Sequence, residues 1–182
     1  MQRIFLIGYM GVGKTTLGKA LADRTGLSFI DLDLFIEGRY RKTIRQIFDE
    51  EGEDAFREIE RRALHEVAEF ENVIISCGGG TPCFFDNMEY MNEQGETVYL
   101  RAETDVLHKH LLMGKSVRPL LLNKTEDEVN QFIADHLAER EVFYTKAKHI
   151  LDVSLMDSYD KIHVSVSQLC KLLKLEKADN QQ

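Results

Sequence analysis

The sequence predicts an α/β fold in which helices cover both faces of a mainly parallel sheet. Short apolar runs typical of strands alternate along the chain with segments whose apolar residues recur at helical spacing. A glycine-rich turn joins the first of these strands to the first helix. The 182 residues, 43% of them hydrophobic, suit one compact domain. We therefore expect a single domain over residues 1–175, followed by a disordered polar tail at 176–182.

The strands are predicted from β-rich runs bounded by turn residues. The first is Arg3–Ile7, and the helix Lys14–Thr25 follows it, because Leu17 and Leu21 recur at helical spacing and Gly26 ends the pattern. Four more strands are expected at Phe29–Leu32, Val73–Ser76, Thr97–Leu100 and His149–Val153. In such a sheet the carboxyl ends of the strands meet at one edge, and ligands bind there.

The other helices show caps and apolar stripes. Thr43 and Gln46 form a capping box that opens a helix at Ile44–Glu51. An apolar stripe beginning at Phe56 predicts the next helix, and Ile162–Leu173 carries a similar stripe near the end. A further helix is expected at Asp86–Gln94, with Met88 and Met91 packed in the core.

Composition excludes several classes of protein. Lysines and arginines number 23 against 31 aspartates and glutamates, a formal charge of −8, and general nucleic-acid binding needs a concentrated basic surface instead. The three cysteines form no C-x-x-C pair, which disfavours a disulfide framework or a zinc site and favours a reducing, cytoplasmic location. The sequence contains neither a membrane-length apolar segment nor a heptad run, so no membrane partner and a monomer are expected.

The glycine-rich turn is a phosphate-binding loop. Residues 8–16 read Gly-Tyr-Met-Gly-Val-Gly-Lys-Thr-Thr, which satisfies G-x-x-x-x-G-K-T between a strand and a helix. Backbone N–H groups and the helix N-terminus would hold phosphates, Lys14 would reach the outer ones, and Thr15 would ligate Mg²⁺. The expected nucleotide contacts are Gly11, Val12, Gly13, Lys14, Thr15 and Thr16. The alternative is a glycine-rich turn with a surface lysine.

Two carboxylates, Asp31 and Asp33, stand at the end of the second predicted strand. Period-two alternation along a strand would send Asp31 and Asp33 to the same side of the chain. Beside a triphosphate, one could hold a metal-bound water while the other accepts a proton from an attacking hydroxyl. The alternative is an aspartate N-cap for a helix that begins near Leu34.

A run of three glycines, Gly78–Gly80, follows the third strand and would let a ligand approach the backbone closely. Walker-B strands usually end in an acidic residue, and none follows Val73–Ser76, so Asp31 is favoured as the metal carboxylate. The missing acid, together with the lack of an Asn-Lys-x-Asp motif, disfavours a motor ATPase or a GTPase.

Three arginines are candidate ligands for anions: Arg57, Arg118 and Arg140. Arg57 adjoins an apolar stripe, and its alternative role is an exposed helix ion pair with Glu53 or Glu60. Arg118 lies in a basic stretch that suits a lid over phosphates, and Arg140 lies on a long helix. His108 and His110, two residues apart, would point to opposite faces of a helix and are interpreted as surface residues rather than metal ligands.

Together these motifs resemble shikimate kinase. The similarity runs from about Arg3 to Val153, with the motifs in order and at similar spacing. They are the phosphate-binding loop, Asp31-Leu32-Asp33, Phe56-Arg57-x-x-Glu60, Gly78–Gly80, Arg118-Pro119-Leu120-Leu121 and Arg140-x-x-x-Tyr144. The resemblance implies the nucleoside monophosphate kinase fold, a three-layer sandwich whose five parallel strands are ordered 2-3-1-4-5. It also implies ATP-dependent phosphorylation of the 3-hydroxyl of shikimate, a step toward chorismate and the aromatic amino acids.

The resemblance also assigns roles by position. Asp33, Arg57, Gly79 and Arg140 would bind shikimate, with the two arginines on its carboxylate. Lys14 and Arg118 would act on the transferring phosphate, and Asp33 would orient or deprotonate the hydroxyl. Thr15 would bind Mg²⁺ directly and Asp31 through water. Residues 34–60 would form the substrate-binding subdomain and roughly 112–125 the lid.

Two rival functions remain open at this point. A kinase for another small acceptor, such as gluconate or a nucleoside monophosphate, would keep the loop and the lid but would not need the four acceptor residues together. A non-catalytic relative that binds nucleotide or a partner is the second, although such proteins should lose Lys14 or an aspartate. Family members also often carry an adenine-packing arginine seven residues before Arg118, where this chain has Leu111.

Overall fold

The computed structural model describes residues 2–113, 125–156 and 159–175. Its strands are β1 (Arg3–Ile7), β2 (Ser28–Asp31), β3 (Val73–Ser76), β4 (Glu96–Arg101) and β5 (His149–Asp152). They form one parallel sheet in the order β2-β3-β1-β4-β5, which confirms the predicted five-stranded fold. In register, Asp31 pairs with Ser76 and Ser76 with Leu6, so the segments that follow β1, β2 and β3 start at the same edge.

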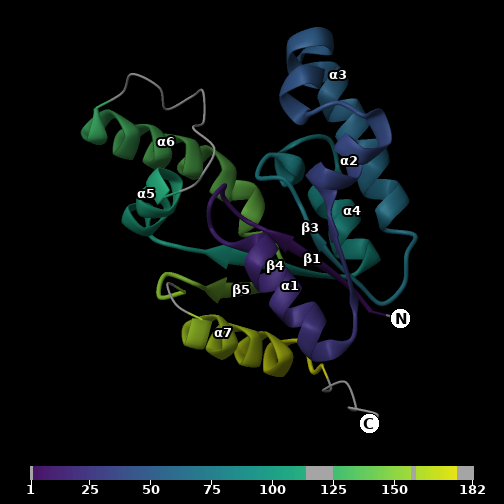
Figure 1. Cartoon of the computed structure of the whole chain (residues 1–182), viewed down its shortest axis with the longest axis vertical. Coiled ribbons are helices and arrows are strands. Elements are labelled where there is room, and N and C mark those ends of the chain that lie inside the picture. Colours follow the sequence, from purple (N-terminus) through teal and green to yellow (C-terminus); the bar gives the residue numbers. More distant parts are fainter. Residues whose placement is uncertain (1, 114–124, 157–158, 176–182) are drawn as a thin grey trace.

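Helices lie on both faces of the sheet (Figure 1). Helices α1 (Lys14–Thr25) and α7 (Tyr159–Leu172) pack together on one face, and α3 (Ile44–Val67) and α4 (Asn87–Gln94) lie behind the sheet in this view. A short 3₁₀ helix, η1 (Thr81–Cys83), links β3 to α4. The helices lie on two faces because crossovers between parallel strands are right-handed. The connection from β1 to β2 runs across the sheet in the opposite direction to the other connections, so its helix α1 lies on the opposite face.

The remaining helices flank the carboxyl edge of the sheet. Helix α2 (Leu32–Tyr40) packs on α3 at one side, and α5 (Thr104–Met113) packs on α6 (Glu126–Tyr144) at the other. Figure 1 shows the α2–α3 pair and the α5–α6 pair standing apart, with the β1–α1 loop between them. This arrangement leaves the ends of β1, β2 and β3 open to a ligand.

Local signals explain the boundaries, with two differences from expectation. The second strand ends at Asp31, one residue early, because the Asp31 carboxylate accepts a hydrogen bond from the Leu34 N–H at 3.3 Å and caps α2. The two helices expected after Thr43 form one element, α3, which is interrupted at Gly52, where φ is 83°. The predicted Thr43–Gln46 capping box is present.

The core lies on both sides of the three central strands. Nearly all of β1, β3 and β4 is buried, and Leu17 and Leu21 of α1 are fully enclosed. Met88 and Met91 are also fully buried, which confirms their predicted packing. Within the described residues, no helix is both long and apolar enough to span a membrane.

Candidate active site

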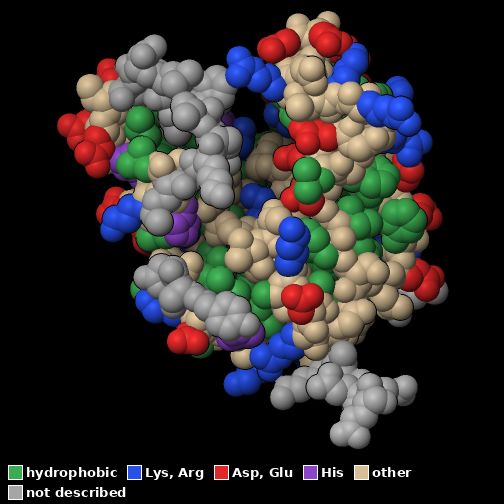
Figure 2. Space-filling view, viewed as in Figure 1, with side chains coloured by type: hydrophobic (Ala, Val, Ile, Leu, Met, Phe, Trp, Pro, Cys, Tyr) green, Lys and Arg blue, Asp and Glu red, His purple; other side chains and the backbone are tan. Residues whose placement is uncertain are grey.

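A cavity of about 580 Å³ opens at the carboxyl edge of the sheet. Figure 2 shows the molecule hollowed there, between the α5–α6 side and the α2–α3 side. The cavity brings together ten of the twelve residues predicted to form the site. These are Gly11, Gly13, Lys14, Thr15, Thr16, Asp31, Asp33, Arg57, Gly79 and Arg140.

The phosphate-binding loop forms one wall of the cavity. Gly11 and Gly13 have φ of 80° and 100°, in the region that side chains disfavour, so glycine is needed at both positions. Lys14 begins α1, and its Nζ donates to the Gly8 and Tyr9 carbonyls at 2.8 and 3.0 Å, which places the ammonium inside the loop. A loop of this kind at a helix N-terminus is suited to bind an anion.

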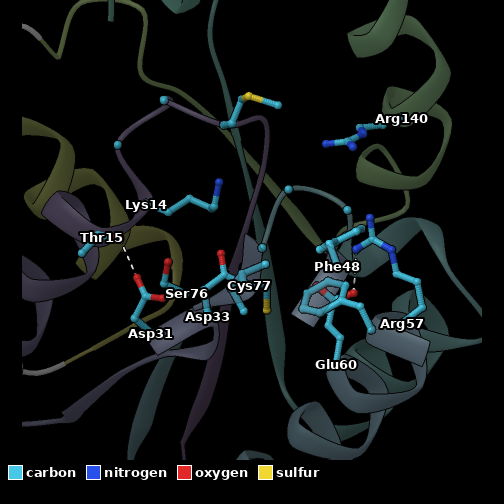
Figure 3. Close-up of a pocket in the computed structure, with 18 of the residues that line it drawn as sticks. Lys14, Thr15, Asp31, Asp33, Phe48, Arg57, Glu60, Ser76, Cys77 and Arg140 are labelled. Atoms are coloured by element: carbon cyan, nitrogen blue, oxygen red, sulfur yellow. Dashed lines mark hydrogen bonds and ion pairs between the residues drawn. The ribbon is translucent and has the colours of Figure 1, made fainter. Parts of the chain in front are cut away.

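A hydroxyl and a carboxylate meet beside the loop. Thr15 Oγ1 donates to Asp31 Oδ2 at 2.8 Å, and both side chains line the cavity (Figure 3). A hydroxyl oxygen and a carboxylate oxygen are suitable ligands for Mg²⁺. This ion takes one or two ligands from the protein and completes its coordination shell with water and substrate phosphates. The residues present therefore fit a magnesium ion.

Asp33 lines the floor of the cavity from the first turn of α2. The strand-alternation argument for this residue was wrong, because β2 ends at Asp31, although both carboxylates do reach one cavity. Burial, reinforced by the nearby charges of Glu60 and Asp31, raises the pKa of Asp33 to about 6. Such a carboxyl can accept a proton near neutral pH.

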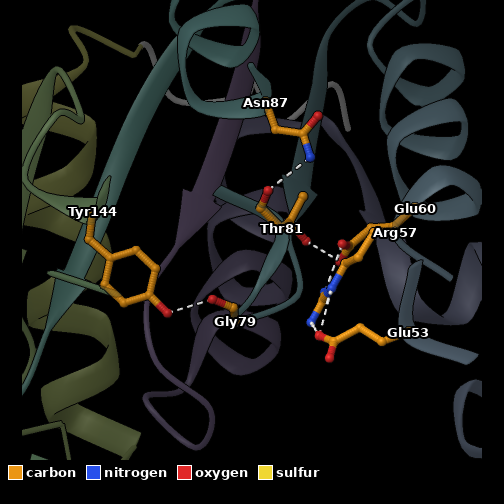
Figure 4. A network of polar contacts seen from close by, with 7 residues as sticks. All are labelled: Glu53, Arg57, Glu60, Gly79, Thr81, Asn87 and Tyr144. Carbon is orange, nitrogen blue, oxygen red and sulfur yellow. Dashed lines mark hydrogen bonds and ion pairs between the residues drawn. The ribbon is translucent and has the colours of Figure 1, made fainter. Parts of the chain in front are cut away.

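Arg57 is held by two carboxylates from its own helix (Figure 4). Its Nη1 donates to Glu60 Oε2 at 2.9 Å, while Nε and Nη2 donate to Glu53 Oε1 at 3.3 and 3.1 Å. Both ion pairs predicted as the alternative therefore exist, but the guanidinium is not exposed: its side chain is 10% accessible and that of Glu60 is 1% accessible. Three of the five N–H groups are used, and two remain for a ligand.

Packing fixes Arg57 further. The Phe84 ring centroid lies 4.0 Å from the guanidinium carbon. The guanidinium also lies so close to Gly80 that a Cβ atom at this position would be only 2.7 Å from Nη1. Glu60 is itself anchored, because Thr81 Oγ1 donates to its Oε1 at 2.6 Å. The guanidinium is therefore presented to the cavity in one orientation.

A second arginine approaches the glycine run from α6. A Cβ on Gly79 would lie 3.1 Å from Arg140 Nη1, and the Tyr144 hydroxyl donates to the Gly79 carbonyl at 2.5 Å. Figure 3 shows Arg140 entering from α6 and Arg57 from α3. Two cations thus meet at the glycine run, opposite Lys14 and the aspartates.

Comparison of the sequence with models of known protein families shows the family to which the chain belongs. The sequence model of one family, described as shikimate kinase, matches residues 10–172, which is most of the chain. The chain belongs to the shikimate kinase family.

Individual shikimate kinases support the assignment. One from Phocaeicola vulgatus is 57% identical over 173 residues, covering 95% of this chain and 99% of the relative. The crystal structure of the Bacteroides thetaiotaomicron shikimate kinase has a TM-score of 0.93 at 52% identity, covering 96% of this chain and 99% of that one. A shikimate kinase from Acinetobacter baumannii, solved in complex with shikimate, has a TM-score of 0.82 at 30% identity, covering 96% of this chain and 94% of that one.

Among the described residues predicted for the site, Val12 does not line the cavity. The Val12 side chain is buried beneath the loop, and the Val12 N–H donates to the Tyr9 carbonyl at 3.3 Å. Arg118, and nearly all of the lid predicted at 112–125, lie outside the described residues, as does the tail at 176–182.

The interpretation of the two α5 histidines as surface residues was wrong. His108 is buried, and the half-buried His110 lies with its Nδ1 2.9 Å from the Gly11 carbonyl of the loop. The described part of the chain contains no cluster of three or more histidine, cysteine or acidic residues that could hold a metal ion. A magnesium ion would thus take most of its ligands from water and the nucleotide phosphates.

Some residues that shape the acceptor end were not predicted. Glu60 was named only as part of the Phe56-Arg57-x-x-Glu60 motif and as an alternative ion-pair partner of Arg57, whereas Thr81 and Phe84 gave no signal in the sequence. Phe48 lines the cavity with its ring centroid 5.7 Å from the Arg57 guanidinium carbon. Phe48 and Glu60 lie on α3 with Arg57, whereas Thr81 lies in η1 and Phe84 directly follows it, so only the fold brings Thr81 and Phe84 to Arg57.

Proposed function

We propose that this protein is a shikimate kinase in activity as well as in family: it transfers the γ-phosphate of ATP to the 3-hydroxyl of shikimate. The product would be shikimate 3-phosphate, on the route to chorismate and the aromatic amino acids. The observation that carries the proposal is the meeting of two arginines, Arg57 and Arg140, at one end of a cavity whose other end is a phosphate-binding loop. An acidic protein needs such local cations to bind an acidic substrate.

The acceptor would lie between the arginines and the loop. Arg57 and Arg140 would hold the shikimate carboxylate, and Gly79 would allow the ring to approach the backbone. Asp33 would accept a hydrogen bond from the 3-hydroxyl and orient it toward the γ-phosphate. These contacts would select a carboxylate-bearing alcohol over neutral polyols.

The transfer then needs positioning and charge stabilisation. The hydroxyl oxygen forms a bond to the γ-phosphorus, the bond from that phosphorus to the bridging oxygen of ADP breaks, and the hydroxyl proton passes to Asp33. Gly11, Gly13, Lys14, Thr15 and Thr16 would hold the phosphates, with Lys14 stabilising the charge on the transferring group. A role for Arg118 on the same group stays a prediction.

Assays of ADP release test this proposal. With purified protein and Mg²⁺–ATP, we expect shikimate to stimulate ADP release, and gluconate, AMP or no acceptor to leave it at background. Arg140→Ala should raise the KM for shikimate tenfold or more, whereas Arg45→Ala, at an exposed arginine of α3, should leave it unchanged. Stimulation by another acceptor would overturn the substrate, and ATP binding without turnover would support a non-catalytic relative.

Mg²⁺ is proposed as the cofactor, held by Thr15 directly and by Asp31 through water. When bound, it would neutralise charge on the ATP phosphates. Asp31→Asn should raise the Mg²⁺ concentration for half-maximal rate several-fold without disturbing α2, because asparagine also caps helices well. Asp23→Asn, at an exposed aspartate of α1, is the matched control. An unchanged Mg²⁺ dependence in the Asp31 variant would contradict this role.

We also propose that the protein acts in the cytoplasm as a monomer. Cys77, Cys83 and Cys170 are free thiols, as expected in a reducing compartment. Light scattering of the purified protein would test the monomer, and a stable dimer mass would contradict it.

A further inference from the structure

Two histidines hold the phosphate-binding loop from outside the cavity. His110 lies near the end of α5, with its Nδ1 2.9 Å from the Gly11 carbonyl oxygen. His136 lies on α6, with its Nδ1 3.0 Å from the Tyr9 hydroxyl. Helices α5 and α6 pack on each other, so both contacts come from one side of the loop (Figure 1). Neither histidine lines the cavity, and neither has a place in the reaction proposed above.

The His110 contact fixes one peptide plane of the loop. A carbonyl oxygen only accepts, so His110 Nδ1 carries the proton in this contact. In a trans peptide the Gly11 carbonyl and the Val12 N–H point in opposite directions, and the Val12 N–H donates to the Tyr9 carbonyl. The peptide is therefore fixed at both ends. Leu111 adds packing, since its Cδ2 would lie 3.1 Å from a Cβ on Gly11.

The His136 contact anchors Tyr9, which connects directly to Lys14. The Tyr9 side chain is 1% exposed, and the Tyr9 carbonyl accepts from Lys14 Nζ at 3.0 Å. Burial, together with the charge of Arg140 one turn along α6, lowers the pKa of His136 and favours a neutral imidazole at neutral pH. A neutral imidazole can accept a hydrogen bond from the Tyr9 hydroxyl at Nδ1.

We propose that His110 and His136 are positioning residues for the nucleotide, which keep the loop in its phosphate-binding shape through the Gly11 carbonyl and the Tyr9 hydroxyl. The inference rests on the proposed function in taking this loop as the nucleotide site. A loop already held in shape loses less conformational entropy when the phosphates bind. Losing either contact should therefore weaken nucleotide binding more than shikimate binding.

Paired substitutions test the contacts separately from packing. Asparagine can place its amide near the position of the histidine Nδ1, whereas leucine keeps the bulk but cannot form the hydrogen bond. His110→Leu and His136→Leu should each raise the Kd for Mg²⁺–ADP, measured by calorimetry, and the KM for ATP by about threefold to tenfold. His110→Asn and His136→Asn should return both constants to within twofold of the unsubstituted protein. His163→Leu, at an exposed histidine of α7, is the control and should change neither.

Tyr9→Phe gives an independent check of the second contact. It removes only the hydroxyl, so it should reproduce the effect of His136→Leu, and the double variant should bind no more weakly than either single one. The proposal is overturned if the leucine variants bind Mg²⁺–ADP normally, or if asparagine and leucine lower the affinity equally. ADP binding is measured without shikimate, so this test gives a result even if the acceptor assignment fails.

Discussion

Asp33→Asn is expected to reduce turnover with shikimate by a factor of about 100 or more while making the folded protein more stable. Positioned general bases contribute roughly 10²–10⁴-fold to a rate, and asparagine can orient a hydroxyl but cannot take its proton. The substitution removes one charge without changing the size of the side chain. The KM for ATP should stay within about twofold, because Asp33 lies on α2 and not in the phosphate-binding loop.

The gain in stability follows from the raised pKa of Asp33. Its value of about 6 in the folded protein lies above the ordinary 3.8, so the folded state holds this proton more tightly than the unfolded state. The resulting stabilisation is complete below pH 3.8 and is lost as the pH rises through 6. Above pH 6 the buried carboxylate makes the free energy of unfolding about 3 kcal/mol smaller than it would be with Asp33 protonated. Asparagine carries no charge and avoids this cost.

Two measurements check this prediction. The pH–rate profile of the unsubstituted protein should fall below about pH 6, as Asp33 becomes protonated. Urea unfolding at pH 7.5 should show a higher midpoint for Asp33→Asn, and no change for Asp54→Asn, at an exposed aspartate of α3. Unaltered turnover in Asp33→Asn would reject the role as a base, and a lower midpoint would reject the electrostatic explanation.

Local patterns predicted most of the fold because its strands and caps are local features. The β1–α1 loop, the Thr43 cap and the buried methionines depend on residues within about one or two turns of each other. The strand order came from the resemblance to a family, because residue patterns alone do not show which strands pair. Asp33 was placed in the right cavity by the wrong geometry, since the carboxylate of Asp31 ends the strand before alternation can apply.

The acceptor end shows where local patterns are insufficient. Spacing along α3 predicted that Arg57 would meet Glu53 and Glu60, and it does. It could not predict that the pair with Glu60 is buried, because Thr81 and Phe84, more than 20 residues away, enclose it. Burial raises the expected cost of removing one partner from a few tenths of a kcal/mol to several, because the other charge is left buried and unpaired. The same burial determines how Arg57 has to be tested.

Arg57→Ala is expected to destabilise the protein by about 3–5 kcal/mol as well as weaken shikimate binding. Removing the guanidinium leaves Glu60 buried with one hydrogen bond from Thr81 and no cation, and an uncompensated buried charge is costly. Loss of activity in this variant alone would therefore not distinguish substrate binding from unfolding. Arg45→Ala should change stability by less than about 1 kcal/mol, because Arg45 pairs with Asp49 in solvent.

Adding Glu60→Gln separates the two effects. Glutamine has no charge to compensate and can still accept the hydrogen bond from Thr81, so the double variant should recover most of the lost free energy of unfolding in urea. Its Kd for shikimate should remain at least tenfold above that of the unsubstituted protein, since a bidentate cation for the carboxylate is still missing. A double variant as unstable as Arg57→Ala would refute the buried-charge explanation. A double variant that binds shikimate normally would show instead that Arg57 stabilises the fold and that Arg140 alone holds the carboxylate.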